Sequence, residues 1–511
     1  MFLLEALKKH AVQIPERCAL ITAGERLTYA RLWERSEAFA SYLNEKHPVK
    51  DPVMIYGHKE EDFLCCMIGA LKAGRAYIPV DITLPADRAE QIVADAHPCV
   101  IVDFPGGGVG ADSGIPVLGA DALAQLLEEY RGREVSSHTW VAGKDPCYIL
   151  FTSGSTGRPK GVPIHCDNLT NFAENLYPFC DPHEKEEVYT NQISYAFDVS
   201  VVSVYIGLSL GRTLYSLPKT LTENMAALME TLGRSDVGFW VSTPSFAELC
   251  VTSALFNGEL MPKLHTFLFC GEVLTHKLVD TLRQRFPKAR IINTYGPTEA
   301  TVLVTASEIT AEMAADERSI PIGEPLPEVT LLVTDETGKE LPEGERGELR
   351  IISRSVSEGY FRRPDLTQKV FFETQDAQGK TVRGYRTGDA CYRLGNQFYY
   401  CGRMDFQIKL NGFRIELEDI ESNLMKIDNV NRAVAIPVFD GEKVAYIAAF
   451  VSLREPDGLP PLKQMLKIKE AAKAYLPSYM IPRKIVVKDR LPVNTNGKAD
   501  RKALAAELSR P

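Results

Sequence analysis

A run of small residues after an apolar stretch has the chemistry of a phosphate-binding loop. Residues 152–161 read TSGSTGRPKG and directly follow CYILF. Hydroxyl side chains, and glycines that lack a Cβ, let backbone N–H groups converge on phosphate oxygens. The spacing is not that of a Walker A loop, because Pro159 precedes Lys160 and no Ser or Thr follows the lysine. The segment predicts a phosphate site of another kind, with a flexible surface loop as the alternative.

A second segment, NTYGPTE at residues 293–299, brings an aromatic ring, hydroxyls and a carboxylate together. It completes an apolar run that predicts a strand, and open α/β sheets bind ligands at the carboxyl ends of their strands. The ring of Tyr295 can stack on a base, and Glu299 offers the oxygen ligands that Mg²⁺ takes beside phosphate. The alternative is a Gly-Pro turn in which Glu299 caps a helix.

Three charged residues in short polar segments complete the candidates. Asp389 ends YRTGD and Arg403 lies in GRMD, on either side of the predicted hairpin CYRLGNQFYYC. A partly buried aspartate can accept hydrogen bonds from both hydroxyls of a ribose, assisted by an arginine, although this segment by itself favours a structural salt bridge. Lys498, in NGK near the C-terminus, is by itself typical of a solvated charge.

Alternating apolar strands and helical segments must position these residues. From Pro52, the runs VMIYG, AYIPVD and CVIVDF are separated by segments of helical periodicity, and the pattern returns around CYILF, TFLFCGE and RIINTYG. This rhythm predicts two α/β subdomains with parallel sheets. From about Val329, strands joined by turn residues predict an antiparallel β subdomain.

The sequence after residue 403 predicts a small α+β domain. Its first helix has apolar positions that repeat every three or four residues, as an amphipathic helix requires; they are Leu417, Ile420, Leu424 and Ile427. The strands RAVAIPVF, VAYIAAFVSL and KIVVK follow, with a helix over residues 462–475. We therefore predict a large N-terminal α/β domain, residues 1–403, and a small C-terminal domain, residues 404–511.

The composition excludes several classes of function. The 511 residues include 58 basic and 67 acidic ones, and the formal net charge of −9 disfavours bulk attraction to nucleic acid. No apolar run approaches the roughly 18 residues of a membrane span, and the segment MFLLEALKKH lacks a signal-peptide core. Eleven cysteines without a C-x-x-C pair fit reduced thiols. We expect a soluble, cytoplasmic protein that neither binds nucleic acid nor inserts into a membrane.

Five segments, in this order and spacing, resemble the adenylate-forming superfamily of acyl- and aminoacyl-activating ligases. They are TSGSTGRPKG, NTYGPTE, YRTGD, GRMDFQIKLNGFRIELEDIE and NGKADRK, and the resemblance covers nearly the whole chain. It implies that a substrate carboxylate attacks the α-phosphorus of ATP, giving an acyl-adenylate and pyrophosphate. The acyl group then passes to a thiol.

The resemblance assigns a role to each matching residue. Lys498 is the implied catalytic lysine, which bridges the substrate carboxylate and the α-phosphate, and Glu299 is the implied Mg²⁺ ligand. Asp405 is the implied hinge of a mobile C-terminal domain, which brings Lys409 and Arg414 towards the thiol in the second half-reaction. The implied ATP-binding residues are Thr152, Ser153, Gly154, Ser155, Thr156, Gly157, Lys160, Asn293, Thr294, Tyr295, Gly296, Pro297, Thr298, Asp389, Tyr400, Cys401, Gly402, Arg403 and Lys498.

Asp198 indicates which kind of acid is activated. In SYAFDVS it resembles the aspartate with which amino-acid-activating members pair the substrate ammonium group. Acyl-CoA synthetases need no anion there, because their acids carry no amine and an unpaired buried carboxylate is costly. The alternative role for Asp198 is a helix N-cap.

Within that branch, WVSTPSF and FLFCGEVL resemble the D-alanine:D-alanyl carrier protein ligases. This implies D-alanine as the substrate, a small side-chain pocket at Cys270 and Val302, and substrate contacts from Asp198 and Lys498. The implied acceptor is the phosphopantetheine thiol of a carrier protein. Two departures concern fine contacts: Ser203 stands where an acidic residue is usual, and GLSLGRTL lacks a double glycine.

Other functions remain as alternatives. A stand-alone amino-acid-adenylating enzyme of non-ribosomal peptide assembly comes second; Asp198 disfavours an acyl-CoA synthetase, and the filled reactive positions disfavour a catalytically silent nucleotide-binding regulator. We expect a separate carrier protein, because no carrier-like serine segment follows Lys502. The lysines of residues 463–473 are a candidate docking face, with a solvated helix face as the alternative.

Overall fold

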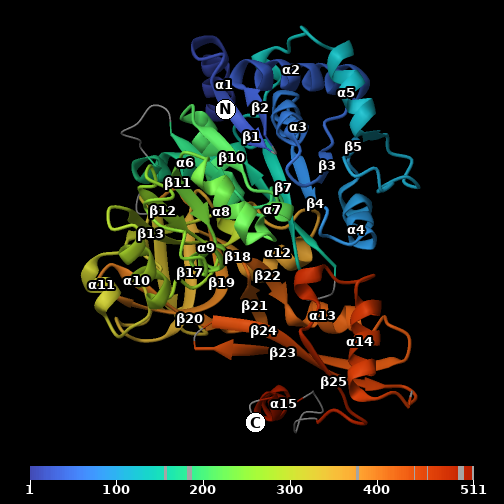
Figure 1. Cartoon of the computed structure of the whole chain (residues 1–511), viewed down its shortest axis with the longest axis vertical. Helices are drawn as coiled ribbons and strands as arrows, with labels where there is room; N and C mark the ends of the chain where they lie inside the picture. Colours follow the sequence, from blue (N-terminus) through green and yellow to red (C-terminus); the bar gives the residue numbers. More distant parts are fainter. Residues whose placement is uncertain are drawn as a thin grey trace. The chain divides into compact units, whose positions relative to one another are not determined.

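The structure is a computed structural model, and it describes residues 1–22, 24–154, 158–180, 187–375, 379–441, 443–456, 458–492 and 500–508 (Figure 1). The chain forms two compact units. The first comprises Met1–Asp81, Ala96–Phe151 and Gly161–Met404, and the second comprises Ile82–Asp95, Thr152–Lys160 and Asp405–Pro511. No helix among the described residues is both long and apolar enough to cross a bilayer.

A six-stranded sheet contains the first predicted α/β rhythm. Its order is β6-β5-β3-β4-β7-β8, and β3 pairs in parallel with β4 and β5. The strands β3 and β4 are buried throughout, as continuous apolar runs in a parallel sheet predict. The bounds are β3 (Val53–Gly57), β4 (Tyr77–Asp81), β5 (Val100–Asp103), β6 (Val117–Gly119), β7 (Pro146–Thr152) and β8 (Lys160–His165).

A nine-stranded sheet holds the second α/β rhythm, in the order β15-β14-β13-β12-β11-β9-β10-β1-β2. From β1 through β10, β9, β11 and β12 to β13 the pairs are parallel, so these carboxyl ends share one edge. The bounds are β1 (Cys18–Thr22), β2 (Glu25–Thr28), β9 (Val188–Asn191), β10 (Thr213–Ser216), β11 (Val237–Ser242), β12 (Thr266–Phe269), β13 (Arg290–Tyr295), β14 (Thr305–Glu308) and β15 (Glu324–Pro325).

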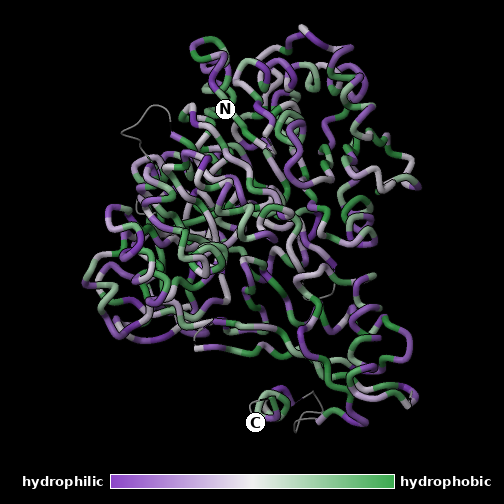
Figure 2. Tube along the Cα trace, viewed as in Figure 1, coloured by the Kyte–Doolittle hydropathy of each residue, from purple (hydrophilic) through white to green (hydrophobic). Residues whose placement is uncertain are grey.

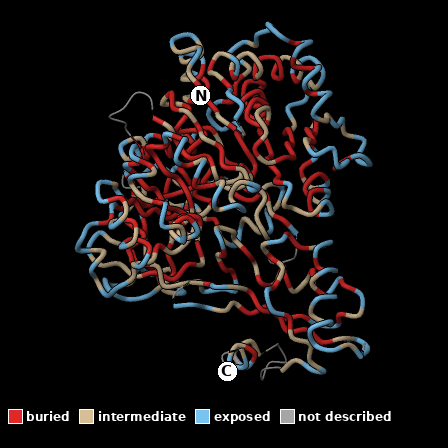
Figure 3. The backbone as a smooth tube through the Cα atoms, viewed as in Figure 1, coloured by how far each residue is buried: buried red, intermediate tan, exposed pale blue. Residues whose placement is uncertain are grey.

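Helices cover these sheets and fix the cores of the first unit. The helices α2 and α3 pack against each other, and the run from Phe63 to Lys72 is buried, mainly hydrophobic helix (Figures 2 and 3). The bounds are α1 (Phe2–Gln13), α2 (Tyr29–Lys46), α3 (Glu61–Lys72), α5 (Ala120–Glu129), α6 (Cys166–Cys180), α7 (Lys219–Thr222), α8 (Met225–Gly233), α9 (Pro244–Val251), α10 (His276–Arg285), α11 (Ala311–Ala315) and α12 (Pro364–Val370). Single turns are η1 (Ser137–Thr139) and η3 (Thr298–Ala300), and η2 (Val202–Gly207) is a π-helix.

The predicted antiparallel subdomain is confirmed. Its five strands begin at Val329, and every pair among them is antiparallel. The bounds are β16 (Val329–Thr334), β17 (Gly347–Ser353), β18 (Phe371–Gln375), β19 (Thr381–Leu394) and β20 (Gln397–Arg403). In the β19–β20 hairpin, Asp389 lies directly opposite Arg403.

The second unit has the predicted α+β architecture. The helix α13 (Leu417–Leu424) ends three residues earlier than its periodicity suggests, but the four expected apolar side chains are all buried in one core. A long hairpin pairs β23 (Val430–Asp440) with β24 (Lys443–Leu453), and β25 (Lys484–Val487) joins in parallel. The remaining elements are α4 (Ala86–Ala96), β21 (Gln407–Leu410), β22 (Phe413–Glu416), α14 (Pro461–Ala472), η4 (Ser478–Met480) and α15 (Arg501–Leu508).

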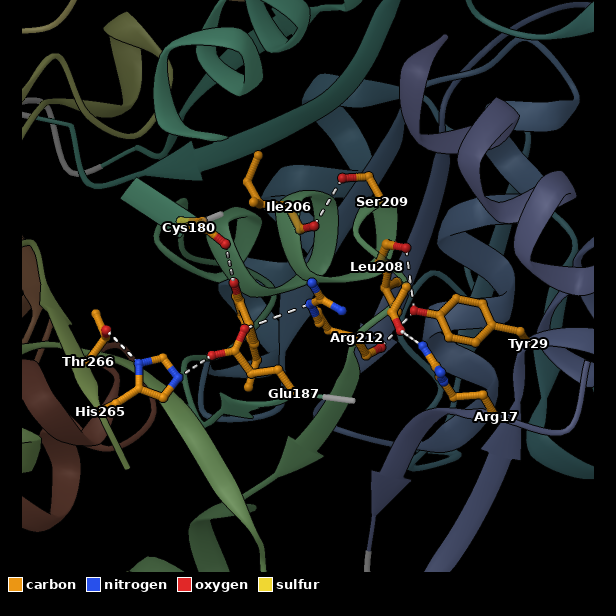
Figure 4. A network of polar contacts seen from close by, with 12 residues as sticks. Arg17, Tyr29, Cys180, Glu187, Ile206, Leu208, Ser209, Arg212, His265 and Thr266 are labelled. Carbon is orange, nitrogen blue, oxygen red and sulfur yellow. Dashed lines mark hydrogen bonds and ion pairs between the residues drawn. The ribbon is translucent and has the colours of Figure 1, made fainter. Parts of the chain in front are cut away.

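A buried polar network ties together the amino ends of three strands in the nine-stranded sheet (Figure 4). Glu187, directly before β9, has its carboxylate 2.6 Å from His265 Nε2 and 3.7 Å from Arg212 Nε. Arg212 precedes β10 and His265 precedes β12. The network therefore lies at the opposite ends of the strands from the candidate ligand-binding edge.

All eleven cysteines lie among the described residues as free thiols. They are buried except Cys99, directly before β5, and Cys401, in β20, which are half-buried.

Candidate active site

A buried carboxylate unites three of the predicted site residues. Asp389 accepts a hydrogen bond from the Tyr295 hydroxyl on one oxygen and from Arg403 at 2.9 Å on the other. Burial raises the pKa of Tyr295 well above its usual value, and the charge of Asp389 acts in the same direction. The backbone carbonyl of Thr387 accepts a second bond from Arg403 at 2.6 Å. The predicted salt bridge therefore exists, and Tyr295 is part of it.

The predicted residues 400–402 lie on β20 next to Arg403, which binds the Asp389 carboxylate. Tyr400, Cys401 and Gly402 precede Arg403 on the strand, and all are half-buried. Gly402 has a φ of 97°, a left-handed conformation that suits glycine.

Glu299 forms a second cluster. Its side chain is fully buried within the turn η3, whose N-cap residue is Pro297. The Tyr360 hydroxyl donates to the Glu299 carboxylate at 2.8 Å, and the Ser357 N–H donates to the Glu299 carbonyl at 2.8 Å. No group of three or more candidate metal ligands occurs among the described residues. A single carboxylate still fits Mg²⁺, which commonly completes its shell with phosphate oxygens and water.

Asp198 is joined to the same turn. It follows β9 in a tight turn, in which the Val201 N–H donates to its carbonyl at 2.9 Å. The Thr298 hydroxyl donates to the Asp198 carboxylate at 2.6 Å. Thr298 thus holds one carboxylate, and the next residue, Glu299, supplies the other.

Cys270 and Val302 lie next to each other. Both are buried, and the Cys270 thiol lies 3.9 Å from the Val302 carbonyl, to which it donates. Thr301 and Val302 have φ values of 59° and 71°, which are uncommon for β-branched residues. The tight approach of this segment requires Gly296, because a Cβ there would lie 2.4 Å from the Leu303 Cα.

Two residues of β13 are used within the fold. The Thr294 hydroxyl donates to the Phe269 carbonyl at 2.8 Å, across to the neighbouring strand. Asn293 donates from Nδ2 to the Pro321 carbonyl at 2.7 Å. Its Oδ1 is buried and finds no hydrogen-bond partner among the described residues, so it remains an acceptor for a ligand amino group.

The second unit holds the other predicted residues. The Thr152 hydroxyl lies 3.5 Å from the Lys160 carbonyl, and the Ser153 hydroxyl donates to the Arg414 carbonyl at 2.9 Å. A Cβ on Gly154 would lie 2.3 Å from the Arg158 carbonyl oxygen, so position 154 requires glycine. Ser155, Thr156, Gly157 and Lys498 lie outside the described residues.

The segment after Asp405 forms a short hairpin. The Asp405 carboxylate accepts from the Gln407 N–H at 3.0 Å, and Lys409 faces Arg414 across β21 and β22.

Sequence reasoning missed the residues that hold the site residues in place. Tyr360 lies in none of the five segments, and Thr387 lies within YRTGD but has no role of its own in the resemblance. Tyr360 donates to Glu299, and the Thr387 carbonyl accepts from Arg403. Only the three-dimensional pairing identifies them.

Comparison with known proteins identifies the family. The model of the AMP-binding enzyme family matches residues 7–361, and that of the AMP-binding enzyme C-terminal domain matches residues 419–498. D-alanine--D-alanyl carrier protein ligases of Bacillus licheniformis and Bacillus thuringiensis are 39% and 38% identical to this chain, each over the full length of both chains.

Solved structures agree on the fold. An adenylation domain of Vibrio cholerae, AlmE, in complex with glycyl-adenosine-5'-phosphate, has a TM-score of 0.83 at 23% identity over 99% of this chain and 97% of its own. An o-succinylbenzoate CoA synthetase of Bacillus subtilis has the same TM-score at 18% identity, over 98% of both chains. The matched sequence, the two α/β sheets with the antiparallel sheet, and the smaller second unit together show that the chain belongs to the AMP-binding enzymes, the adenylate-forming superfamily of ligases.

Proposed function

We propose that this enzyme activates D-alanine with ATP and transfers it to the phosphopantetheine thiol of a D-alanyl carrier protein, the first step of teichoic acid D-alanylation. The observation that carries the proposal is the pair of carboxylates around Thr298. Asp198 offers an anion for the substrate ammonium group. Its carboxylate accepts a hydrogen bond from the Thr298 hydroxyl, and the buried Glu299 is the next residue after Thr298. The full-length similarity to D-alanine--D-alanyl carrier protein ligases supports this substrate and acceptor.

The two half-reactions follow from this assignment. In the first, a carboxylate oxygen of D-alanine forms a bond to the α-phosphorus of ATP, and the bond from that phosphorus to the bridging oxygen of pyrophosphate breaks. In the second, the carrier thiol loses its proton, its sulfur attacks the acyl carbon, and AMP leaves. Lys498 would offset the charge that develops on the α-phosphate in the first step.

Each bound group has proposed protein contacts. Asp389, with Tyr295 and Arg403, would accept hydrogen bonds from the ribose hydroxyls, and the Asn293 segment would line the adenine pocket. Glu299 would hold Mg²⁺, which screens the phosphate charges when it is bound. The loop at residues 152–160 would bind the leaving phosphates. Residues 404–511 would then act as a mobile domain, hinged at Asp405, that inserts and withdraws Lys498.

Cys270 and Val302 would line a small pocket for the substrate side chain. Both residues are buried, and residues 301 and 302 have a left-handed backbone. A methyl group fits such a pocket better than a long or branched side chain.

Pyrophosphate exchange tests the proposal. We expect exchange to be fastest with D-alanine among D-alanine, L-alanine, glycine and D-serine, and absent with a fatty acid. We also expect Lys498→Ala to abolish exchange while ATP binding, measured by calorimetry, is retained. Preference for a larger amino acid would favour peptide-assembly chemistry instead, and exchange with a fatty acid would refute the amine site.

A further inference from the structure

A polar cluster lies where two sheets of the first unit bring their carboxyl ends together. His58 and Lys59 follow β3, and Asp81 ends β4 of the six-stranded sheet. Asn191 ends β9 and Ser216 ends β10 of the nine-stranded sheet. The segment from Ile193 to Asp198 begins two residues after the end of β9, so this cluster adjoins the loop that carries the proposed ammonium-binding carboxylate.

Lys59 binds the start of that loop. It is only 4% exposed, and its Nζ donates to Asn191 Oδ1 at 2.8 Å and to the Ile193 carbonyl at 2.6 Å. The same Nζ lies 3.8 Å from the centroid of the Tyr195 ring, within the range of a cation–π contact. Burial lowers the pKa of Lys59, and the nearby charge of Asp81 opposes that shift.

Asn191 fixes the orientation of Tyr195. Its Nδ2 donates to the Tyr195 hydroxyl at 2.9 Å and to the Ser216 hydroxyl at 3.0 Å, while its Oδ1 accepts from Lys59. The amide is thus used on both sides, which assigns its orientation without ambiguity.

Asp81 binds the residue between Ile193 and Tyr195. One carboxylate oxygen accepts from the Ser194 hydroxyl and from His58 Nδ1 at 2.8 Å. The other nitrogen of His58, Nε2, accepts from the Lys219 N–H at 3.3 Å, which assigns the proton to Nδ1. Three consecutive loop residues, 193–195, are therefore bound by side chains of the other sheet.

These contacts lead directly to Asp198. The Ser194 carbonyl accepts from the Phe197 N–H at 3.0 Å, and its hydroxyl accepts from the Ala196 N–H at 3.3 Å, so a tight turn joins the bound residues to Asp198. Thr298 then holds the Asp198 carboxylate from the far side. The loop is therefore held at two places, at residues 193–195 and at the Asp198 carboxylate itself.

We propose that Lys59 and Asp81 are positioning residues that set the affinity for the substrate ammonium group by holding the loop of Asp198. The proposal rests on the proposed function, because it needs Asp198 to bind an amine. A carboxylate displaced by about 1 Å from a bound ammonium group loses much of its contribution to binding, whereas contacts with the nucleotide are unaffected.

Two ligands separate this role from a purely structural one. The first is 5'-O-[N-(D-alanyl)sulfamoyl]adenosine, a stable mimic of the adenylate, and the second is its propionyl counterpart, which lacks the amine. We expect Lys59→Met to weaken binding of the alanyl compound at least ten-fold by calorimetry, and of the propionyl compound less than two-fold. Equal weakening of both compounds would overturn the proposal.

Matched variants control for general damage. Lys72 is also fully buried and also lies over an aromatic ring, 3.1 Å from the Trp33 centroid, but it contacts α2. Lys72→Met should leave the ratio of the two affinities unchanged. Ser194→Ala removes only the hydroxyl that binds Asp81, and it should lower the ratio even if Lys59→Met does not fold; an unchanged ratio in Ser194→Ala would contradict the role of Asp81.

The wild-type protein separates this proposal from the proposed function. If the wild type binds the alanyl and propionyl compounds equally, the amine site itself is refuted. If it prefers the alanyl compound and Asp198→Asn removes the preference, the amine site stands. Retention of that preference in both Lys59→Met and Ser194→Ala would then refute the positioning role alone.

Discussion

At the scale of single residues, the site separates two carboxylates by giving each its own hydroxyl donor. Thr298 donates to Asp198, and Tyr360 donates to Glu299. Each hydroxyl donor fixes the orientation of the carboxylate that accepts its hydrogen bond. An ammonium group and a metal ion can therefore be bound near each other by anions with separate partners.

Lys72 gives the clearest expectation for pH. Burial lowers its pKa to about 7, against the opposing influence of Glu37 at 3.1 Å. Between pH 7 and about 10.5 the unfolded chain binds this proton and the folded chain does not, so the contribution of Lys72 to stability rises with pH. We expect the free energy of unfolding of the wild type, relative to Lys72→Met, to rise by about 1–2 kcal/mol from pH 7.0 to 8.5 in urea titrations. A flat or falling difference would contradict this.

The sequence motifs name most of the candidate site residues, but not the residues that contact them. Asp389 and Arg403 were chosen for a nucleotide or for a salt bridge, and the structure shows that the bridge exists while Tyr295 shares it. The sequence predicts no role for Lys59 or Asp81, because their contacts are with Asn191 and Ser194, more than a hundred positions away. Local patterns cannot report contacts of that separation.

At the scale of elements, apolar runs predicted which segments are strands better than how they are arranged. The runs around β3, β4, β5, β12 and β13 are strands as expected. The position of β9 between β11 and β10, and of β1 beside β10, depends on pairing between distant segments. The spacing of apolar residues along the chain carries no information on the order of the strands in the sheet.

The turn between β13 and η3 depends on the absence of a side chain at Gly296. In Gly296→Ala, the Cβ would lie 2.4 Å from the Leu303 Cα and 2.6 Å from the Val302 carbonyl oxygen, so the pocket segment must move. We expect a loss of about 1–3 kcal/mol in the free energy of unfolding and a higher KM for D-alanine. Gly119→Ala is the control, because Gly119 has a φ of −72° and no atom within 4 Å of the added Cβ. Similar losses in both variants would argue against the close approach.

The contacts of the lysines on α14 bear on the hypothesis that this helix is a docking face for a carrier protein. Lys469 donates to the Arg483 carbonyl at 2.6 Å, and Lys473 lies 2.5 Å from Glu470, so their charges are partly used within the unit. Lys463 and Lys467 are sequence neighbours of Leu462 and Leu466, whose side chains are 64% and 55% exposed. Apolar side chains beside basic ones suit an acidic partner with an apolar contact.

Charge reversal on α14 tests that face. We expect Lys463→Glu combined with Lys467→Glu to raise the KM for the carrier about ten-fold while pyrophosphate exchange is unchanged, because only the second half-reaction uses the carrier. Lys8→Glu combined with Lys9→Glu on α1 makes the same change in net charge and serves as the control. An effect of equal size in the control would indicate long-range electrostatics rather than docking.

At the scale of the whole molecule, the Glu187 network and the candidate site lie at opposite ends of the same strands. The Glu187 network binds the amino ends of β9, β10 and β12 (Figure 4). Cys270 and Tyr295 lie at the carboxyl ends of β12 and β13, and Asp198 lies in the loop after β9. Open α/β sheets commonly bind ligands at the carboxyl ends, which leaves the amino ends for structural contacts.

Removing the charge of Glu187 should therefore affect folding alone. We expect Glu187→Gln to lower the free energy of unfolding by about 1–3 kcal/mol, because a buried acceptor of His265 loses its charge, and to leave the KM for D-alanine unchanged. Glu308→Gln is the control, since its ion pair with Arg290 is largely exposed and should contribute under about 1 kcal/mol. A changed KM in Glu187→Gln would show that the two ends of the strands are coupled.

The two half-buried cysteines are natural sites for attaching a fluorescent label. Alkylating reagents meet buried sulfurs everywhere except at Cys99 and Cys401. Cys401 is two positions before Arg403, which holds Asp389, whereas Cys99 lies directly before β5 of the six-stranded sheet. A fluorophore attached at Cys401 would thus sense occupancy of the proposed nucleotide site, and a fluorophore at Cys99 would serve as the reference, without any engineered cysteine.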